Sequence, residues 1–310
     1  MNLDIHLTSF WIDPIDTWTK WFQPVPVIVP NDDYQLPERI DDLELCSPIA
    51  YILDLMRRMA VDCDQLGNPY HNTNHALRVM QNVLQALQEI ERQCNIELPD
   101  GLRDIIALAC ICHDHKHPGK TFLTDVSASR LRRHYAWFNP EITAVEQVSA
   151  FNCVDNLYQH SATPAQQLLA TYLIWSTAYG GATERGKELG VDKVQPHAPL
   201  GLLMRAADVT LLCDDVASFD ADVAVNYGEG GFKGSIPEYV ANRRSFLNYV
   251  SECYRALDRS LDFNLTSLLR WRSRLDENQL LLDKVEVGDP YALVILKTQI
   301  DKYRMPTYPR

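Results

Sequence analysis

The sequence lacks the features that would place it in several large classes of protein. Its eight cysteines include no CxxC pair, so neither a zinc–cysteine site nor a disulfide framework is indicated, and a reducing compartment is expected. No uninterrupted apolar run approaches the roughly 18 residues of a membrane span. The segment from Met1 to Ile5 contains an acid and no basic stretch, which argues against a signal peptide. We therefore expect a cytoplasmic protein with no membrane partner.

Positive charge is scarce, and so is any repetition. The formal net charge of −12 excludes the extended basic surface that a nucleic-acid-binding protein needs. A small anionic substrate is still compatible with this charge, because a bound metal can invert the local potential. We find no internal repeat and no low-complexity tract. With 310 residues and 46% hydrophobic residues, the chain can form one large domain or two small ones.

Strand-type alternation is missing, whereas helical periodicity runs through most of the chain. Residues 25–29 are the best strand candidate, but prolines interrupt them. Apolar residues at three- and four-residue steps predict an amphipathic helix after residue 75: Leu77, Met80, Leu84, Leu87 and Ile90. Residues 102–113 are apolar nearly all round and predict a buried central helix. The fold class is therefore all-α.

Local signals predict where three further helices begin. Ser235 and Glu238 have the S-x-x-E spacing of a capping box. Thr163-Pro164 and Asp289-Pro290 each place a capping side chain before a proline in the first turn of a helix.

Residues 1–45 differ in composition from the rest of the chain. They hold three tryptophans, a proline-rich stretch and an acidic run over residues 32–44. We interpret them as an N-terminal extension that packs on the body of the protein, and residues 46–310 as a single all-α catalytic domain. A partner-binding or dimerising arm is the alternative, which makes a homodimer one of the expectations.

Two histidine-rich segments carry most of the chemical information. Residues 70–75 read YHNTNH and residues 113–119 read HDHKHPG, so these two segments contain five of the nine histidines. Imidazole and carboxylate together suit a divalent metal ion. His71 and His75 would share one face if their helix begins near Tyr70. His113 and Asp114 end the buried helix, where both side chains could turn into a cavity. We interpret the segments as a metal-dependent hydrolase site.

Asp208 is the best candidate for a further ligand from a distant helix. It lies in an apolar segment, residues 204–210, beside two small alanines that allow close approach. A buried carboxylate without a partner is costly, so such a residue normally has a cation beside it. A salt bridge to Arg205 would also satisfy it, but the histidine cluster favours the metal.

These three segments, in this order and spacing, resemble the signature of the class I cyclic-nucleotide phosphodiesterases of the HD-domain hydrolase superfamily. The resemblance covers roughly residues 50–260, with dense agreement only at the three segments. It implies that His75, His113, Asp114 and Asp208 hold one metal, usually zinc. Asp114 would also bridge to a second metal, usually magnesium or manganese. A hydroxide between the two metals would attack the phosphorus of a 3′,5′-cyclic nucleotide, and His71 would be the general acid.

The same resemblance suggests supporting roles for other residues. His117 matches a histidine that supports the metal site without binding the metal. Glu146 lies where the family has a glutamate that orients waters of the second metal. His115 has no counterpart, and we expect it to be solvated or hydrogen-bonded. Tyr179 falls near a substrate-facing position, although the glycines that follow it suggest a helix end.

The departures from the family pattern concern the substrate. Arg243, three residues before Phe246, stands where the family has a glutamine that binds the purine. A guanidinium only donates hydrogen bonds, whereas a glutamine amide also accepts them, so the base is not identified. Both residues are candidate substrate contacts, although Arg243 would be a surface residue if the local alignment is shifted. Residues 228–234 form a glycine-rich loop, either a lid or a connector.

Three functions follow from this reading. The first is hydrolysis of cyclic AMP, cyclic GMP or both to the 5′-monophosphate. The second keeps the metal site, as an HD-domain phosphohydrolase acting on another nucleotide or phosphoester. The third is a binding or signalling protein that uses a degenerate site as a sensor, against which the complete set of ligands and His71 count.

Overall fold

The computed structural model describes residues 68–95, 97–98, 100–115, 146, 149–150, 152–154, 157, 164–178, 199–213, 219–229, 232–261 and 263–304. Within these ranges every regular element is a helix and no residue lies in a strand, which confirms the all-α prediction. The predicted N-terminal extension with its boundary at residue 45, the strand candidate at residues 25–29, His117 and Tyr179 lie outside the described residues.

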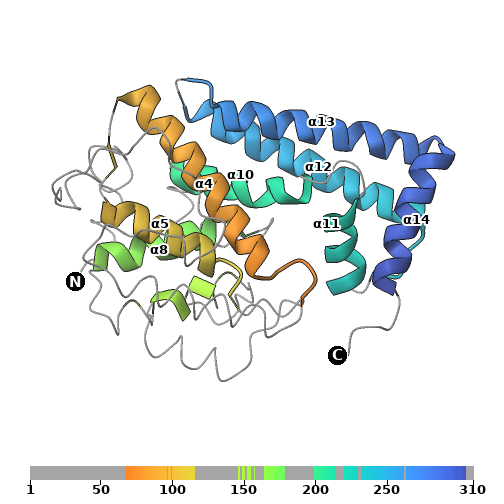
Figure 1. Ribbon diagram of the computed structural model, residues 1–310, viewed down its shortest axis with the longest axis horizontal. Coiled ribbons are helices and arrows are strands. Elements are labelled where there is room, and N and C mark those ends of the chain that lie inside the picture. The colour runs from red at the N-terminus through yellow and green to blue at the C-terminus, as the bar shows by residue number, and fades with distance from the viewer. Residues whose placement is uncertain are drawn as a thin grey trace, which may run out of the picture.

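The helices form two groups that meet along α4 and α10 (Figure 1). The first group contains α4 (Thr73–Cys94), α5 (Asp100–Cys112), α8 (Pro164–Ser176) and α10 (Pro199–Thr210). The second contains the adjacent pair α12 (Ile236–Arg259) and α13 (Thr266–Glu286), with α14 (Pro290–Arg304) across their far end. Between α10 and α12 the chain forms η4 (Leu211–Cys213), α11 (Asp220–Val223) and the π-helix η5 (Ala224–Glu229).

The helix starts follow the predicted capping chemistry. The side chain of Ser235 accepts from the backbone N–H of Glu238, and the Glu238 carboxylate accepts from the backbone N–H of Ser235, so the capping box is confirmed. α8 begins at Pro164 and α14 at Pro290. Asp289 Oδ1 accepts from the Ala292 backbone N–H at 2.9 Å, which satisfies one of the free donors of the first turn of α14.

The core lies where the sequence predicts it. Leu102, Ile105, Ile106 and Leu108 of α5 are almost completely buried, as a central helix requires. The predicted face of α4 is buried as well, with Leu84 packed at its margin. Both helices therefore hold their polar ends, His75 and His113, at fixed positions against a solid interior.

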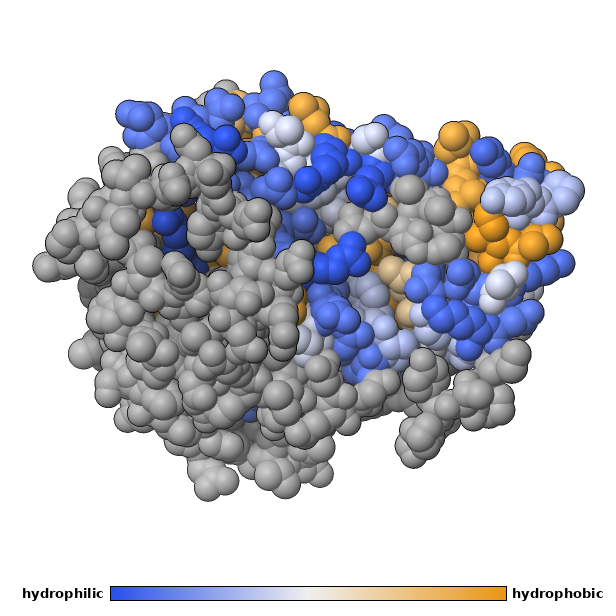
Figure 2. All heavy atoms as spheres, in the orientation of Figure 1, coloured by the Kyte–Doolittle hydropathy of each residue, from blue (hydrophilic) through white to orange (hydrophobic). Residues whose placement is uncertain are grey.

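Exposed apolar side chains gather on the surface where α13 turns into α14 (Figure 2). Val287, Tyr291 and Val294 are the most exposed of them. Single apolar residues of this kind are normal on protein surfaces. None of the described helices is both long enough and apolar enough to cross a bilayer.

Candidate active site

The site begins at the N-terminus of α4. Asn72 is the N-cap: its Oδ1 accepts from the His75 backbone N–H at 3.2 Å, and its Nδ2 donates to the Pro69 carbonyl at 3.2 Å. The helix therefore starts at Thr73, so the condition for His71 and His75 to share a helical face is not met. The His71 ring nevertheless lies 5.6 Å from the His75 ring, because the capped turn folds back over the first turn of the helix.

Four predicted side chains converge from three helices or helix ends. His75 comes from α4, His113 and Asp114 follow the end of α5, and Asp208 comes from α10. One ligand atom of each lies within 4.8 Å of every other. Asp208 faces His75 and His113, at 3.2 and 3.4 Å from their Nε2 atoms, while Arg205 donates to the Ser176 carbonyl instead.

The distances between these atoms fit a four-coordinate metal. His75 Nε2 lies 3.0 Å from Asp114 Oδ2 and 3.1 Å from His113 Nε2, and His113 Nε2 lies 2.9 Å from Asp114 Oδ2. Metal–ligand bonds of about 2.0–2.1 Å in a tetrahedron place neighbouring ligand atoms roughly 3.3 Å apart. The measured separations match that edge length, so the donor set fits a zinc-type ion.

Hydrogen bonding orients the His113 ring for such a role. Its Nδ1 lies 2.6 Å from the Cys110 carbonyl oxygen, which can only accept, so Nδ1 carries a proton. In the neutral ring Nε2 is then the lone-pair atom, and it points at the cluster. Burial alone would lower the pKa of His113, but Asp114 and Asp208 outweigh burial and raise it well above its usual value. The cluster therefore attracts positive charge.

His71 lies beside the cluster and is held by Glu229. Its Nδ1 contacts Glu229 Oε2, and the other carboxylate oxygen accepts from the backbone N–H groups of Tyr70 at 2.7 Å and His71 at 2.9 Å. His71 Nε2 is 4.0 Å from Asp114 Oδ2. Burial lowers the pKa of His71, but Asp114 and Glu229 together raise it above its usual value. The ring is thus kept protonated with Nε2 directed toward the cluster.

Glu229 reaches this position through a tight approach of two backbone segments. It is the last residue of the π-helix η5, an element often found at functional sites. A Cβ atom on the preceding Gly228 would lie only 2.9 Å from Cγ of Pro69, so a glycine is needed there. Gly228 therefore allows η5 to pack directly against the turn that carries His71.

Glu146 is close enough to the cluster to sense its charge. Burial, with further contributions from Asp114 and Asp208, raises the pKa of Glu146 to about 7. Glu146 is not one of the four converging ligands. Its surroundings therefore agree with an acidic neighbour of the site rather than a direct ligand of the first metal.

Arg243 belongs to a separate buried cluster. It is only 2% exposed, and its guanidinium donates to Asp222 Oδ1 at 2.8 Å, to the Leu212 carbonyl at 2.5 Å and to Asn278 Oδ1 at 3.2 Å. The suggestion that Arg243 is a surface residue is therefore wrong. Its guanidinium lies over the Phe246 ring at 5.4 Å. These contacts favour a structural role for Arg243, and the substrate contacts assigned to both residues stay predictions.

Two residues were misjudged or missed by sequence reasoning. His115 is buried, with its carbonyl accepting from Ser149 Oγ at 3.1 Å, so the solvated alternative is wrong. Glu229 was missed, because it lies in a glycine-rich segment that reads as a lid or connector. The signal that could have found it is that Glu229 is the only acid among residues 228–234.

Comparison with known proteins gives one family. Residues 70–135 match the family described as 3′5′-cyclic nucleotide phosphodiesterase, and no curated protein matches the chain. The matched segment contains His71, His75, His113 and Asp114, and Asp208 joins them in space. With an all-helical fold and a cluster suited to a metal, the chain carries a catalytic domain of the class I 3′,5′-cyclic nucleotide phosphodiesterases, which are metal-dependent enzymes.

Proposed function

We propose that the protein hydrolyses a 3′,5′-cyclic nucleotide, cyclic AMP or cyclic GMP, to its 5′-monophosphate. The observation that carries the proposal is the convergence of two imidazoles and two carboxylates beside a protonated histidine. The residues around this cluster supply both the ligands and the acid that phosphodiester cleavage requires.

The four converging side chains would hold the first metal, for which we propose zinc. Asp114 would in addition contact a second ion, magnesium or manganese, and Glu146 and His117 would orient the groups around the two ions. When bound, two divalent ions supply a bridging hydroxide as the nucleophile and neutralise the charge of the phosphate. Zinc suits the imidazole-rich set, whereas magnesium prefers oxygen ligands and keeps several waters.

His71 would protonate the oxygen that leaves phosphorus. Its Nδ1 is held by Glu229, so Nε2 is the atom that can donate a proton toward the substrate. A general acid of this kind contributes about 10²–10⁴-fold to the rate. We expect His71→Ala to lower kcat by about that factor while metal content is unchanged. An unaltered kcat would contradict the assignment.

The substrate base is the least specified part of the proposal. Arg243 is engaged with Asp222, so it lacks the free amide-like group with which a glutamine reads a purine. This favours keeping a second candidate, a phosphohydrolase acting on another nucleotide or phosphoester. Phe246 and Tyr179 remain our proposed neighbours of the substrate.

The decisive experiment measures metal content and turnover on one preparation. We expect the purified full chain, supplied with manganese, to hydrolyse cyclic AMP or cyclic GMP. Cyclic dinucleotides and nucleoside monophosphates serve as competing substrates. Normal metal binding with no turnover of either cyclic nucleotide would overturn the substrate assignment, and binding without hydrolysis of any phosphoester would favour a sensor.

We extend the proposal to the whole chain only in outline. Residues 46–310 would form one catalytic domain, with residues 1–45 as an extension that packs on it or mediates a homodimer. A cytoplasmic location would fit the reduced cysteines of the described core.

A further inference from the structure

A polar pocket of ≈ 230 Å³ lies between α4 and α13, formed by residues that the proposed mechanism does not use. Three arginines line it: Arg78 from α4, and Arg270 and Arg274 from α13. Trp271 and amide side chains of α4, among them Asn82 and Gln85, complete the lining. No acidic residue lines the pocket. In a chain of net charge −12, this concentration of positive charge stands apart from the rest of the surface.

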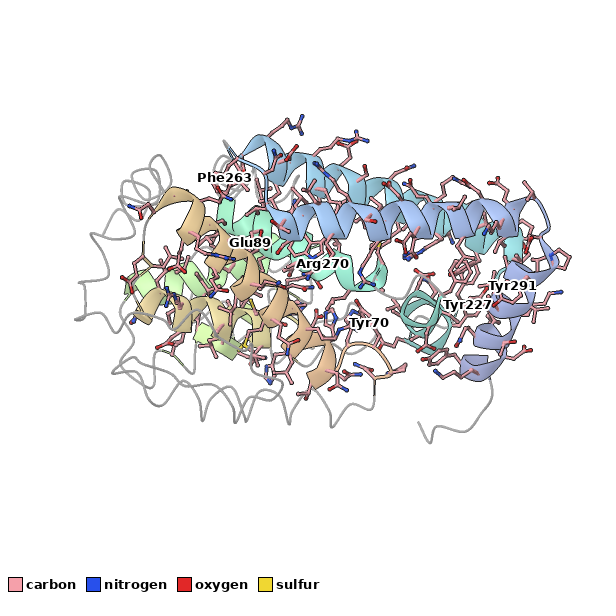
Figure 3. The ribbon with its side chains drawn as sticks, turned by 45° about the horizontal axis from the view of Figure 1, so that its top comes forward. Tyr70, Glu89, Tyr227, Phe263, Arg270 and Tyr291 are labelled. Atoms are coloured by element: carbon pink, nitrogen blue, oxygen red, sulfur yellow. The ribbon has the colours of Figure 1, made fainter. Side chains whose placement is uncertain are left out.

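The two helices present these side chains toward each other. Residues 78, 82 and 85 are spaced by four and three along α4, and residues 270 and 274 by four along α13, so each set occupies one helical face. Arg270 donates to Gln85 Oε1 at 2.9 Å and so joins the two faces. Figure 3 shows Arg270 where α13 crosses α4. The pocket is thus a feature of the helix packing.

Two buried donors of the lining have no hydrogen-bond acceptor among the described residues. The Nε1–H of Trp271 is one of them, although Trp271 is only 1% exposed, and the Nδ2 amide of Asn82 is the other. A buried donor left without an acceptor costs free energy, and such groups are rare in folded proteins. Both orphan groups donate, so the missing partner must accept hydrogen bonds.

We propose that this pocket is a binding site for a phosphate-type dianion, either free phosphate or the phosphoryl group of a small metabolite. Guanidinium groups match the oxygens of phosphate and carboxylate through paired, charge-assisted hydrogen bonds. A tetrahedral phosphate offers acceptors in several directions, as donors from two facing helices require, whereas a carboxylate offers two oxygens in one plane.

The pocket would act without a metal ion. None of its lining residues belongs to the His75–His113–Asp114–Asp208 cluster. Arg78 follows His75 by three residues, about one turn along α4. The site therefore does not rest on the proposed catalytic function, although it shares a helix with the metal cluster.

The test titrates inorganic phosphate by calorimetry into the full chain after treatment with EDTA. We expect the wild-type protein to bind phosphate under these conditions. Arg270→Gln should weaken the affinity by about 10-fold or more, because it removes a charged donor. Trp271→Phe should weaken it by about 3- to 10-fold, because it removes only the Nε1–H. Arg272→Gln is the matched control: Arg272 is on the same helix but pairs with Asp258 at 3.1 Å, and its affinity should be unchanged.

Two results would overturn the proposal. One is the absence of phosphate binding after metal removal, which would assign any earlier binding to the metal cluster. The other is an Arg270→Gln variant that binds as tightly as the Arg272→Gln control. Because Arg270 is exposed, its replacement keeps the test valid even if Trp271→Phe fails to fold, and circular dichroism checks each variant. A nucleoside 5′-monophosphate that binds more tightly than phosphate, and only with Arg270 present, would identify a metabolite as the source.

Discussion

The protein contains two buried clusters of charge that differ in how they are balanced. In the metal-type cluster, two carboxylates face the Nε2 atoms of two histidines, one of which keeps its proton on Nδ1. In the Asp222 cluster, one carboxylate accepts from Arg243, from the Tyr239 hydroxyl and from Asn226. The first set is rich in acceptors and attracts a cation, whereas the second contains its own cation.

This difference separates chemistry from scaffolding in residues of the same types. Acceptors that face one another are unfavourable unless a proton or a metal ion joins them. An arginine that donates to a carboxylate, a carbonyl and an amide oxygen is already satisfied. A buried aspartate alone therefore does not identify a catalytic site, and its partners decide. Each prediction below breaks one cluster or the link between them.

The largest effect is expected from Asp208→Asn, which breaks the acceptor-rich cluster. An amide cannot replace the carboxylate charge, so metal binding should be lost and turnover should fall by more than about 100-fold, the upper loss from removing groups that merely support a ligand. At 100 times its dissociation constant, zinc should stabilise the wild-type protein by about 2.7 kcal/mol and the variant by much less. Metal analysis, turnover and thermal unfolding measure these effects.

Asp276→Asn is the control for this change, since Asp276 is exposed on α13. It should bind metal and turn over substrate like the wild-type chain. An Asp208→Asn variant with full metal content and activity would remove the cluster from the mechanism.

The next effect is expected from Arg243→Leu, which breaks the balanced cluster. Removal of one partner of a buried ion pair leaves the Asp222 charge uncompensated, and the unfolding free energy should fall by about 3–5 kcal/mol. Denaturant unfolding measures this loss. Metal content should be unchanged, because Arg243 contacts none of the four ligands.

Arg244→Leu gives the matched comparison on the same helix. Arg244 pairs with Asp283 and Glu286 on the exposed surface, so its loss should cost under about 1 kcal/mol. Equal losses for the two variants would show that Arg243 is not structural. A stable Arg243→Leu variant with a raised KM would instead support a contact with substrate.

The smallest effect is expected from Glu229→Gln, and it appears in the pH dependence. Together with Asp114, Glu229 holds the pKa of His71 above its usual value against the opposing effect of burial. Without the carboxylate the pKa falls, so the protonated form of His71 is lost at a lower pH. The alkaline limb of the kcat/KM profile should therefore move to lower pH. Glu277→Gln, an exposed change on α13, should leave the profile in place.

Sequence reasoning found the parts of the fold and site that depend on neighbouring residues. The apolar faces of α4 and α5 and the caps of α12 and α14 are encoded within a few residues, so periodicity and capping rules predict them. His75, His113 and Asp114 lie in dense motifs, and Asp208 was noticed as an acid in an apolar segment. Their convergence in the structure follows from where the buried helices begin and end.

The partners that act across the fold were not predictable in this way. Glu229 contacts His71 from 158 residues away, and Asp222 contacts Arg243 from a short helix with no motif of its own. The start of α4 was also ambiguous, because Asn72 can be read as helical or as a cap until its hydrogen bonds are known. Tertiary contacts decide each of these features.

The π-helix η5 makes the length of its segment as important as its composition. A π-turn holds one more residue than an α-turn, and one residue corresponds to about 100° of rotation around a helix. Deletion of a single residue between Asp222 and Gly228 would let the segment relax into an α-helix and turn Glu229 away from His71. Insertions and deletions here are therefore expected to be tolerated less than substitutions, although the segment reads as an ordinary surface connection.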